Sequence, residues 1–158
     1  MKFKKITTDQ YIDIAKIAGV AVGAFLVFGK NGLLSRFTNL TNKQINETTK
    51  KEIKEIENTG VKASFGSSQY VTFADQLYNA VITSNPFNPT DEQTIYRVFG
   101  AMNNLIDVLK LIQAFGVRRL EFSTKGAGLA THLQEDLNSS EIAKLNKILA
   151  DKNINYKF

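Results

Sequence analysis

The sequence predicts an all-α protein, and three observations lead to that fold class. Residues 17–29 form a run without charge, apolar residues recur at helical spacing through residues 69–158, and residues that cap helix N-termini precede several of these periodic stretches. We therefore divide the 158-residue chain into an N-terminal membrane-anchor helix (1–37), a polar tether (38–68) and a bundle of five short helices (69–158).

The composition bounds the function as well as the fold. Hydrophobic residues make up 43 % of the chain and charged residues 22 %, which suits one packed domain. The 20 Lys and Arg exceed the 15 Asp and Glu but form no basic stripe, so we expect no specific nucleic-acid partner. With no Cys and one His, the chain lacks the residues of disulfides, thiolate chemistry and most zinc sites. We expect no catalysis, no metal and no cofactor.

The predicted anchor begins with a basic group, Lys2, Lys4 and Lys5, and continues into the uncharged run. That run has 13 residues, and a spanning helix needs about 20, but the flanks from Tyr11 to Leu34 lengthen it. The residues assigned to the anchor are Ile17, Gly19, Val20, Val22, Gly23, Phe25, Leu26 and Phe28. The alternatives are a helix packed against protein and a cleaved signal peptide, although the segment GKNGLLSRF shows no small-x-small cleavage pattern.

Gly19 and Gly23 give the anchor a G-x-x-x-G pair. Small residues at this spacing allow two helices to approach closely in lipid. The partners predicted for the chain are therefore the lipid bilayer and either other structural proteins or a second copy, which would associate through the anchor helix.

Residues 38–68 are rich in Thr, Asn, Lys and Glu, a composition that is poor at burying surface. The only regular structure that we predict in this segment is a short helix over Thr49–Glu57. Gly60 and Gly66 follow and should end it. We expect it to be a tether that holds the C-terminal domain away from the anchor.

Five helices follow in the C-terminal domain. Their predicted starting points are Thr72, Thr90 with Gln93, Asn103 or Asn104, the residues before Leu129, and Asn138 with Glu141. The residues expected in the core are Ile95, Phe99, Leu109, Leu133 and Leu145. Gly116 should end the third helix, the stretch VRRLEFSTKGAG should be a loop, and the alternating Ile154, Tyr156 and Phe158 predict a short strand or a packed tail.

Five short helices in this order, with TDEQTIYRVF opening the second, resemble a single annexin repeat. The resemblance covers residues 73–153, about half of the chain, and is strongest at Thr90, Asp91, Glu92 and Ile95. It implies an annexin-like helical domain.

The calcium site of the annexins is not implied. Their calcium loop reads G-x-G-T, with an acidic residue further along the chain. The matching stretch here is PFNPT, and STKGAG, where the acidic residue should lie, provides Lys125 and no carboxylate. Calcium takes several oxygen ligands including carboxylates, so we expect no calcium site.

The end of the chain carries a second resemblance, to small virion proteins of phages that infect Bacteroidetes-type bacteria. It rests on the TDE helix and on a final pattern formed by Asn146, Ile148, Leu149, Lys152, Ile154, Tyr156 and Phe158. This resemblance implies a structural role in a particle with an internal lipid layer.

Candidate chemistry is sparse. His132 would need a partner such as Glu135 or Asp136 to act as a base, and we expect a surface or partly buried histidine whose replacement by Ala costs little. The adjacent Asp91 and Glu92 would point in different directions on a helix. The stretch TKGAG has the glycines of a phosphate-binding turn, but the order of a P-loop is missing.

The sequence thus predicts a non-catalytic, membrane-associated structural protein, most specifically a minor capsid protein at the internal membrane or vertex of a membrane-containing phage. The alternative is a peripheral membrane module of a bacterial cell that binds calcium and phospholipid. A small enzyme is the third hypothesis, disfavoured by the missing catalytic constellations.

Overall fold

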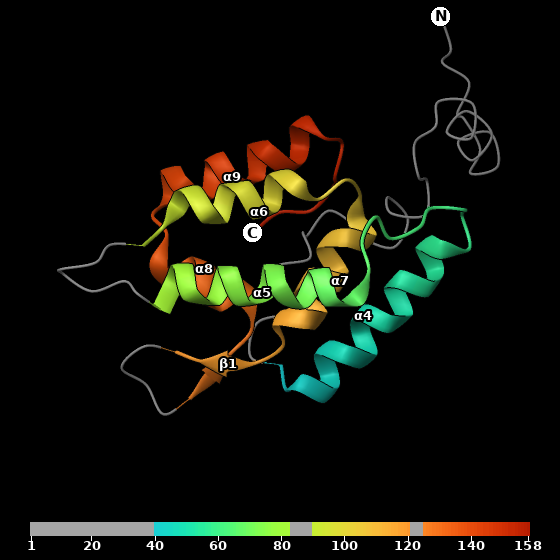
Figure 1. Ribbon diagram of the computed structural model, residues 1–158, viewed down its shortest axis with the longest axis horizontal. Helices are drawn as coiled ribbons and strands as arrows, with labels where there is room; N and C mark the ends of the chain where they lie inside the picture. Colours follow the sequence, from blue (N-terminus) through green and yellow to red (C-terminus); the bar gives the residue numbers. More distant parts are fainter. Residues whose placement is uncertain (1–39, 83–89, 121–124) are drawn as a thin grey trace, which may run out of the picture.

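The computed structural model describes residues 40–82, 90–120 and 125–158. This part of the chain is mostly helical, with a short two-stranded hairpin (Figure 1). The elements are α4 (Asn42–Glu57), α5 (Ser67–Ile82), α6 (Glu92–Ala101), α7 (Leu105–Phe115), β1 (Arg118–Arg119), β2 (Gly126–Ala127), α8 (Leu129–Asp136) and α9 (Ser139–Asp151).

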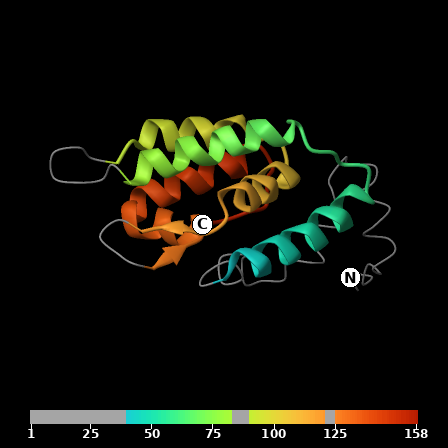
Figure 2. The ribbon, with the colours of Figure 1, turned by 60° about the horizontal axis from the view of Figure 1, so that its bottom comes forward.

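Helices α5 to α9 pack around one core. Helix α5 lies against α6, α7 and α8, and α9 lies along α6, so that two views show the bundle as layered short helices (Figures 1 and 2). The five residues predicted for the core, Ile95, Phe99, Leu109, Leu133 and Leu145, all have an exposed fraction of 0 %. Burial of these side chains is the main source of stability, because helices of this length are marginal in isolation.

Several helix ends lie where the capping residues predicted them. Asn138 and Glu141 form the expected reciprocal capping box at α9, with the Glu141 carboxylate accepting from the Asn138 N–H at 2.8 Å. Asn104 caps α7, and Gly116 ends it with a φ of 60°, a conformation that favours glycine.

Two predicted caps were wrong. Helix α6 is capped by Asp91, whose Oδ1 accepts from the Thr94 N–H at 2.9 Å, while Thr90 is buried just before the helix. Helix α5 begins at Ser67, so Thr72 lies inside it and its hydroxyl donates to the Ser68 carbonyl. The part of α5 that precedes Thr72 contains Tyr70, and the burial of this side chain stabilises the helix there.

The tether prediction was wrong for most of residues 38–68. Helix α4 runs over 16 residues and packs on α7, burying Ile45, Ile53 and Ile56 together with Thr49 and Glu52. The polar composition of the segment hid this helix, because three isoleucines suffice for one narrow apolar face when a partner surface is available.

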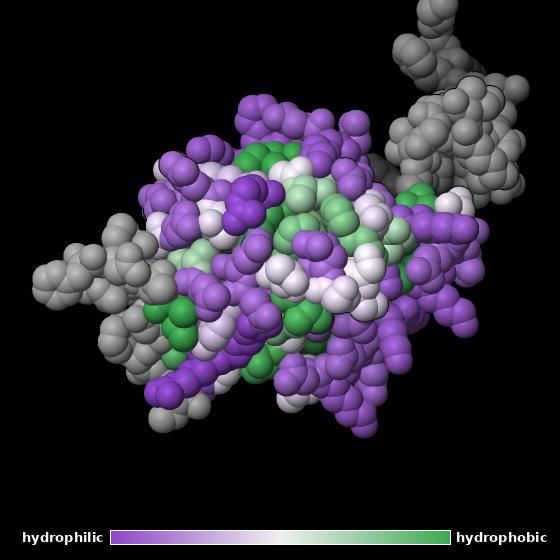
Figure 3. Space-filling view, in the orientation of Figure 1, coloured by the Kyte–Doolittle hydropathy of each residue, from purple (hydrophilic) through white to green (hydrophobic). Residues whose placement is uncertain are grey.

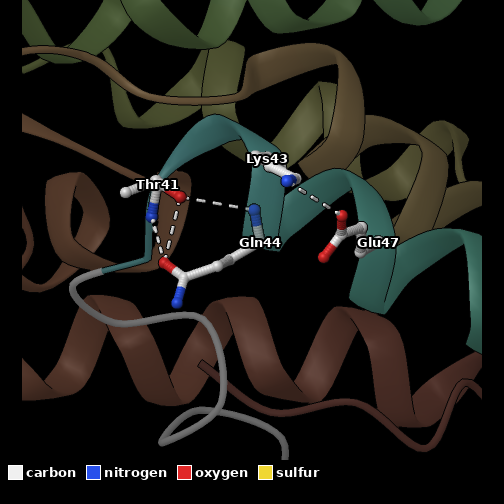
Figure 4. Close-up of polar contacts among 4 residues, drawn as sticks. All are labelled: Thr41, Lys43, Gln44 and Glu47. Atoms are coloured by element: carbon white, nitrogen blue, oxygen red, sulfur yellow. Dashed lines mark hydrogen bonds and ion pairs between the residues drawn. The ribbon is translucent and has the colours of Figure 1, made fainter.

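Helix α4 begins with a capping box of its own. The Thr41 hydroxyl accepts from the Gln44 N–H at 3.4 Å, and the Gln44 Oε1 accepts from the Thr41 N–H at 3.0 Å (Figure 4). Lys43 and Glu47 form an exposed ion pair at 4.0 Å on the first turns. The T-x-x-Q spacing is a sequence signal for a helix start that the tether prediction overlooked.

The predicted loop between α7 and α8 contains the hairpin. Arg118 pairs with Ala127 and Arg119 with Gly126 in antiparallel register. A Cβ atom on Gly126 would lie 2.6 Å from Val117 Cγ1, so glycine allows the strands to approach. Two residues per strand are too few for alternation to reveal a strand.

Residues 154–158 form an extended segment that we call the C-terminal strap. Ile154, Tyr156 and Phe158 are buried, while Asn155 and Lys157 are exposed. The alternation therefore describes a tail packed on the bundle, and it is not part of the hairpin sheet.

The predicted anchor, residues 1–37 with Ile17, Gly19, Val20, Val22, Gly23, Phe25, Leu26 and Phe28, lies outside the described residues. Within residues 40–82, 90–120 and 125–158, no helix has the length and apolar character to cross a membrane. One face of the molecule is largely hydrophilic with small separate hydrophobic areas (Figure 3). In the described part of the chain, Val71 is the one exposed large hydrophobic residue, at 49 %.

Candidate functional site

The strongest candidate for chemistry is the histidine cluster, which we define as His132, Tyr78, Phe115, Arg118 and Asp75. These residues come from α8, α5, α7, β1 and α5, so the fold brings together positions that the sequence keeps far apart. His132 is only 2 % exposed, contrary to the surface or partly buried position predicted from the sequence.

Aromatic rings enclose His132. Its ring centroid lies 5.8 Å from that of Tyr78 and 5.2 Å from that of Phe115, both in edge-to-face arrangements. Its Nε2–H donates to the Arg118 carbonyl at 3.3 Å, since a carbonyl oxygen can only accept. The histidine therefore joins α8 to the hairpin.

Arg118 contacts the same two aromatic residues. Its guanidinium carbon lies 5.1 Å from the Tyr78 ring centroid and 5.0 Å from that of Phe115, within cation–π range. The guanidinium also binds Asp75 at 2.8 Å and donates through Nε to the Phe115 carbonyl at 3.0 Å. Arg118 is thus held by several groups at once and serves to fasten the hairpin to α5 and α7.

Electrostatics in the cluster favour a neutral histidine. Burial lowers the pKa of His132 below its usual value of 6.5, and the charge of Arg118 acts in the same direction. The hydrogen bond to the Arg118 carbonyl and the charge of Glu135 oppose this shift of the pKa. Glu135 itself is exposed on α8.

A second buried polar group lies at the start of α7. The Asp107 carboxylate is fully buried and accepts from the Tyr70 hydroxyl at 2.6 Å, the Ser64 N–H at 2.8 Å and the Asn103 N–H at 2.9 Å. These bonds satisfy both oxygens, as a buried charge requires. The isolated acid in the apolar stretch LIDVLKLI is the sequence signal that would have identified it.

The Asp107 network has a structural consequence. Burial, followed by the hydrogen bond and charge of Asp107, raises the pKa of Tyr70, so its phenol stays protonated and keeps donating. Asn104 adds a bond from its Nδ2 to the Lys62 carbonyl at 3.0 Å. Together these groups pin the connection between α4 and α5 onto the first turn of α7.

The other residues singled out in the sequence have roles in capping or packing. Asp91 caps α6, and the bonds from Thr94 lower the pKa of its carboxyl. In the TKGAG stretch, Gly126 belongs to the hairpin and Gly128 is the N-cap of α8. Within the described ranges, no group of His, Asp and Glu is arranged to hold a metal ion.

No protein-family model, curated protein or solved structure matches this chain.

Proposed function

We propose that the chain is a non-catalytic structural protein that residues 1–37 hold in a bilayer, most specifically a minor capsid component of a membrane-containing phage. The observation that carries the proposal is the uncharged run from Ile17 to Gly29, with lysines before it. An anchor of this kind would place the α5–α9 bundle, which we call the head, beside the membrane surface.

The chemistry of the head supports a structural role. His132 is enclosed by rings and by a backbone carbonyl, and Asp107 uses its oxygens to fix the chain. A catalytic histidine must reach both a substrate and a proton partner by hydrogen bonds. The ring of His132 is buried, and its Nε2 is already bonded to the Arg118 carbonyl. The buried polar groups are best explained as hydrogen-bonding groups that join one helix, strand or loop to another.

The two resemblances complete the proposal. The annexin-like arrangement implies five short helices and brings no calcium site, because PFNPT lacks the glycines of the annexin loop. The virion resemblance favours a particle with an internal membrane as the location of the protein. The Gly19 and Gly23 pair would let anchor helices associate with one another or with other structural proteins.

The anchor is tested by flotation of the full chain with neutral phosphatidylcholine vesicles. We expect the chain to float, and we expect Val22→Asp combined with Leu26→Asp to abolish flotation, because each charge costs about 2.5–3.5 kcal/mol at a helix centre in lipid. Val71→Asp is the control, since Val71 is exposed on α5 and the substitution adds a charge outside the run. A parent chain that stays soluble and apart from the vesicles would refute the anchor.

Two further measurements separate the candidate functions. Mass spectrometry of particles purified from the source culture should detect the chain if it is a virion component, and its absence would remove that assignment. Calcium titration by calorimetry should show no tight, stoichiometric uptake. Tight uptake, with flotation that depends on calcium, would favour the alternative, a calcium- and phospholipid-binding module.

A further inference from the structure

The C-terminal strap leaves α9 through a strained reversal of the chain at Asn153. This residue has a φ of 58°, a left-handed conformation that glycine adopts freely and that Asn tolerates better than most residues. The Asn153 N–H donates to the Ala150 carbonyl at 2.9 Å, and the Ile154 N–H donates to the Leu149 carbonyl at 2.9 Å. These two bonds form the Schellman pattern of a helix end. The reversal is therefore what folds the strap back onto its own helix.

The strap lies on a surface that we call the strap site, formed by Phe99 of α6 and Asn146 of α9. The Asn146 Nδ2 donates to the Phe158 carbonyl at 2.9 Å, and its Oδ1 accepts from the Phe158 N–H at 2.7 Å. The ring centroids of Phe158 and Phe99 lie 5.0 Å apart. Ile154, Tyr156 and Phe158 are all buried, while the two residues between them are exposed. Every second side chain of the strap thus packs on the bundle.

The strap site has the chemistry to bind an extended peptide segment. The Asn146 side-chain amide pairs with both the N–H and the carbonyl of one residue, groups that every residue other than proline offers. Alternate apolar side chains lie on the same side of an extended chain, as Ile154, Tyr156 and Phe158 do. Neither kind of contact requires the strap to continue from the same α9. A second copy of the chain carries the same segment and can therefore make the same contacts.

Helices α6 and α9 are joined to each other without the strap. They pack together, the Lys152 ammonium donates to the Gly100 carbonyl, and the Lys144 ammonium lies 4.2 Å from the centroid of the Tyr96 ring. If the strap leaves, these contacts keep the two helices in place, while Phe99 loses the aromatic ring of the strap that packs on it. Exposure of apolar surface is unfavourable, so an open strap site will bind a strap again, from the same chain or from another.

We propose that the strap site binds the C-terminal strap of a second copy, so that two chains exchange straps and form a dimer. In a reciprocal exchange each strap keeps its contacts, and the strained reversal at Asn153 is relieved in both chains. Exchange is favoured where copies are concentrated, and the intramolecular strap is favoured where they are dilute. This inference goes beyond the proposed function, because it assigns association between copies to the head and does not involve residues 1–37.

Two substitutions at Asn153 test the exchange in the full chain in detergent micelles. Asn153→Gly eases the reversal and should favour the closed monomer, whereas Asn153→Ala disfavours it and should favour the exchanged dimer. Because each dimer relieves two reversals, we expect a dimer dissociation constant roughly hundredfold lower for Asn153→Ala than for Asn153→Gly. Sedimentation equilibrium over a range of protein concentrations measures both constants. Asn155→Ala is the control: Asn155 is exposed on the strap outside the reversal, so this variant should associate like the parent.

Phe158→Asp combined with Asn153→Ala identifies the surface that makes the dimer. A charge beside the Phe99 ring prevents the strap from docking on either copy, so we expect the dimer to be lost while circular dichroism retains the helical signal. A dimer that persists would overturn the exchange. Equal dissociation constants for Asn153→Ala and Asn153→Gly would also overturn it, and this comparison decides the matter if the double variant unfolds. All variants share residues 1–37, so association through the predicted anchor cancels in the comparison.

Discussion

His132 shows how one buried residue ties local chemistry to stability. Its ring packs between Tyr78 and Phe115, and its Nε2–H reaches the Arg118 carbonyl. The sequence predicted that replacing it with Ala would cost little. Because the side chain is 2 % exposed and hydrogen-bonded, we now expect a loss of about 1–3 kcal/mol.

The depressed pKa of His132 predicts that the protein loses stability in mild acid. Unfolded histidine binds a proton near pH 6.5, whereas the folded group binds one only at lower pH. The contribution is complete above about pH 6.5 and is lost as pH falls through the folded pKa. Urea unfolding followed by circular dichroism between pH 7.5 and about 5.5 should show this decline. His132→Gln should have a shallower decline, and an unchanged slope would contradict the assignment.

Neither the position of His132 nor that of Asp107 followed from the sequence, for a physical reason. Both residues are polar, and the sequence indicates a buried polar residue only weakly, since its partners lie on other elements. Asp107 meets Ser64 and Tyr70 across 43 and 37 positions of the chain. Apolar residues such as Ile95 were predicted more easily, because helical spacing alone assigns them to an inner face.

At the scale of elements, the contact between α4 and the end of α7 depends on Gly116. A Cβ atom there would lie 2.6 Å from Asn42 Oδ1, the atom that accepts from the Val117 N–H. Gly116 also has a φ of 60°, which disfavours any side chain. The glycine therefore permits both the turn and the attachment of α4.

We expect Gly116→Ala to destabilise the protein by about 1–3 kcal/mol, from backbone strain and from displacement of Asn42. Gly100→Ala is the matched control: Gly100 lies within α6, and an added Cβ would meet no atom within 4 Å. That variant should be neutral or more stable by about 0.5–1 kcal/mol, because Ala favours helix. Thermal melts of both variants decide the point, and equal effects would contradict this account of Gly116.

Helix α4 and the hairpin also show which elements a single sequence reveals. The capping residues Asn104 and Asn138 predicted the starts of α7 and α9, because a cap acts within one turn of the chain. The sequence predicted a tether where α4 lies. Helix α4 is stabilised by its packing on α7, and the local sequence does not indicate that contact. The hairpin pairs Arg118 with Ala127 through residues that carry no strand pattern.

At the scale of the whole molecule, the described part of the chain is stable only as a unit. Helix α8 has 8 residues and α6 has 10, lengths at which an isolated helix is marginal in water. Their core faces are completed by neighbours from distant segments, as when Phe158 of the strap packs on Phe99 of α6. We therefore expect the described helices to unfold cooperatively.

Phe99→Ala tests that cooperativity. Phe99 has an exposed fraction of 0 % and joins α6 to the strap, so truncation removes a buried ring and leaves a cavity. Such a change costs about 3–5 kcal/mol, against a total stability of about 5–15 kcal/mol for a domain. Circular dichroism melts should show one transition at a much lower temperature, with all helical signal lost together. Val71→Ala, at a side chain that is 49 % exposed, should melt within a few degrees of the parent. If Phe99→Ala melted like the parent, α6 would not face the core, and the arrangement of α5 to α9 described above would be wrong.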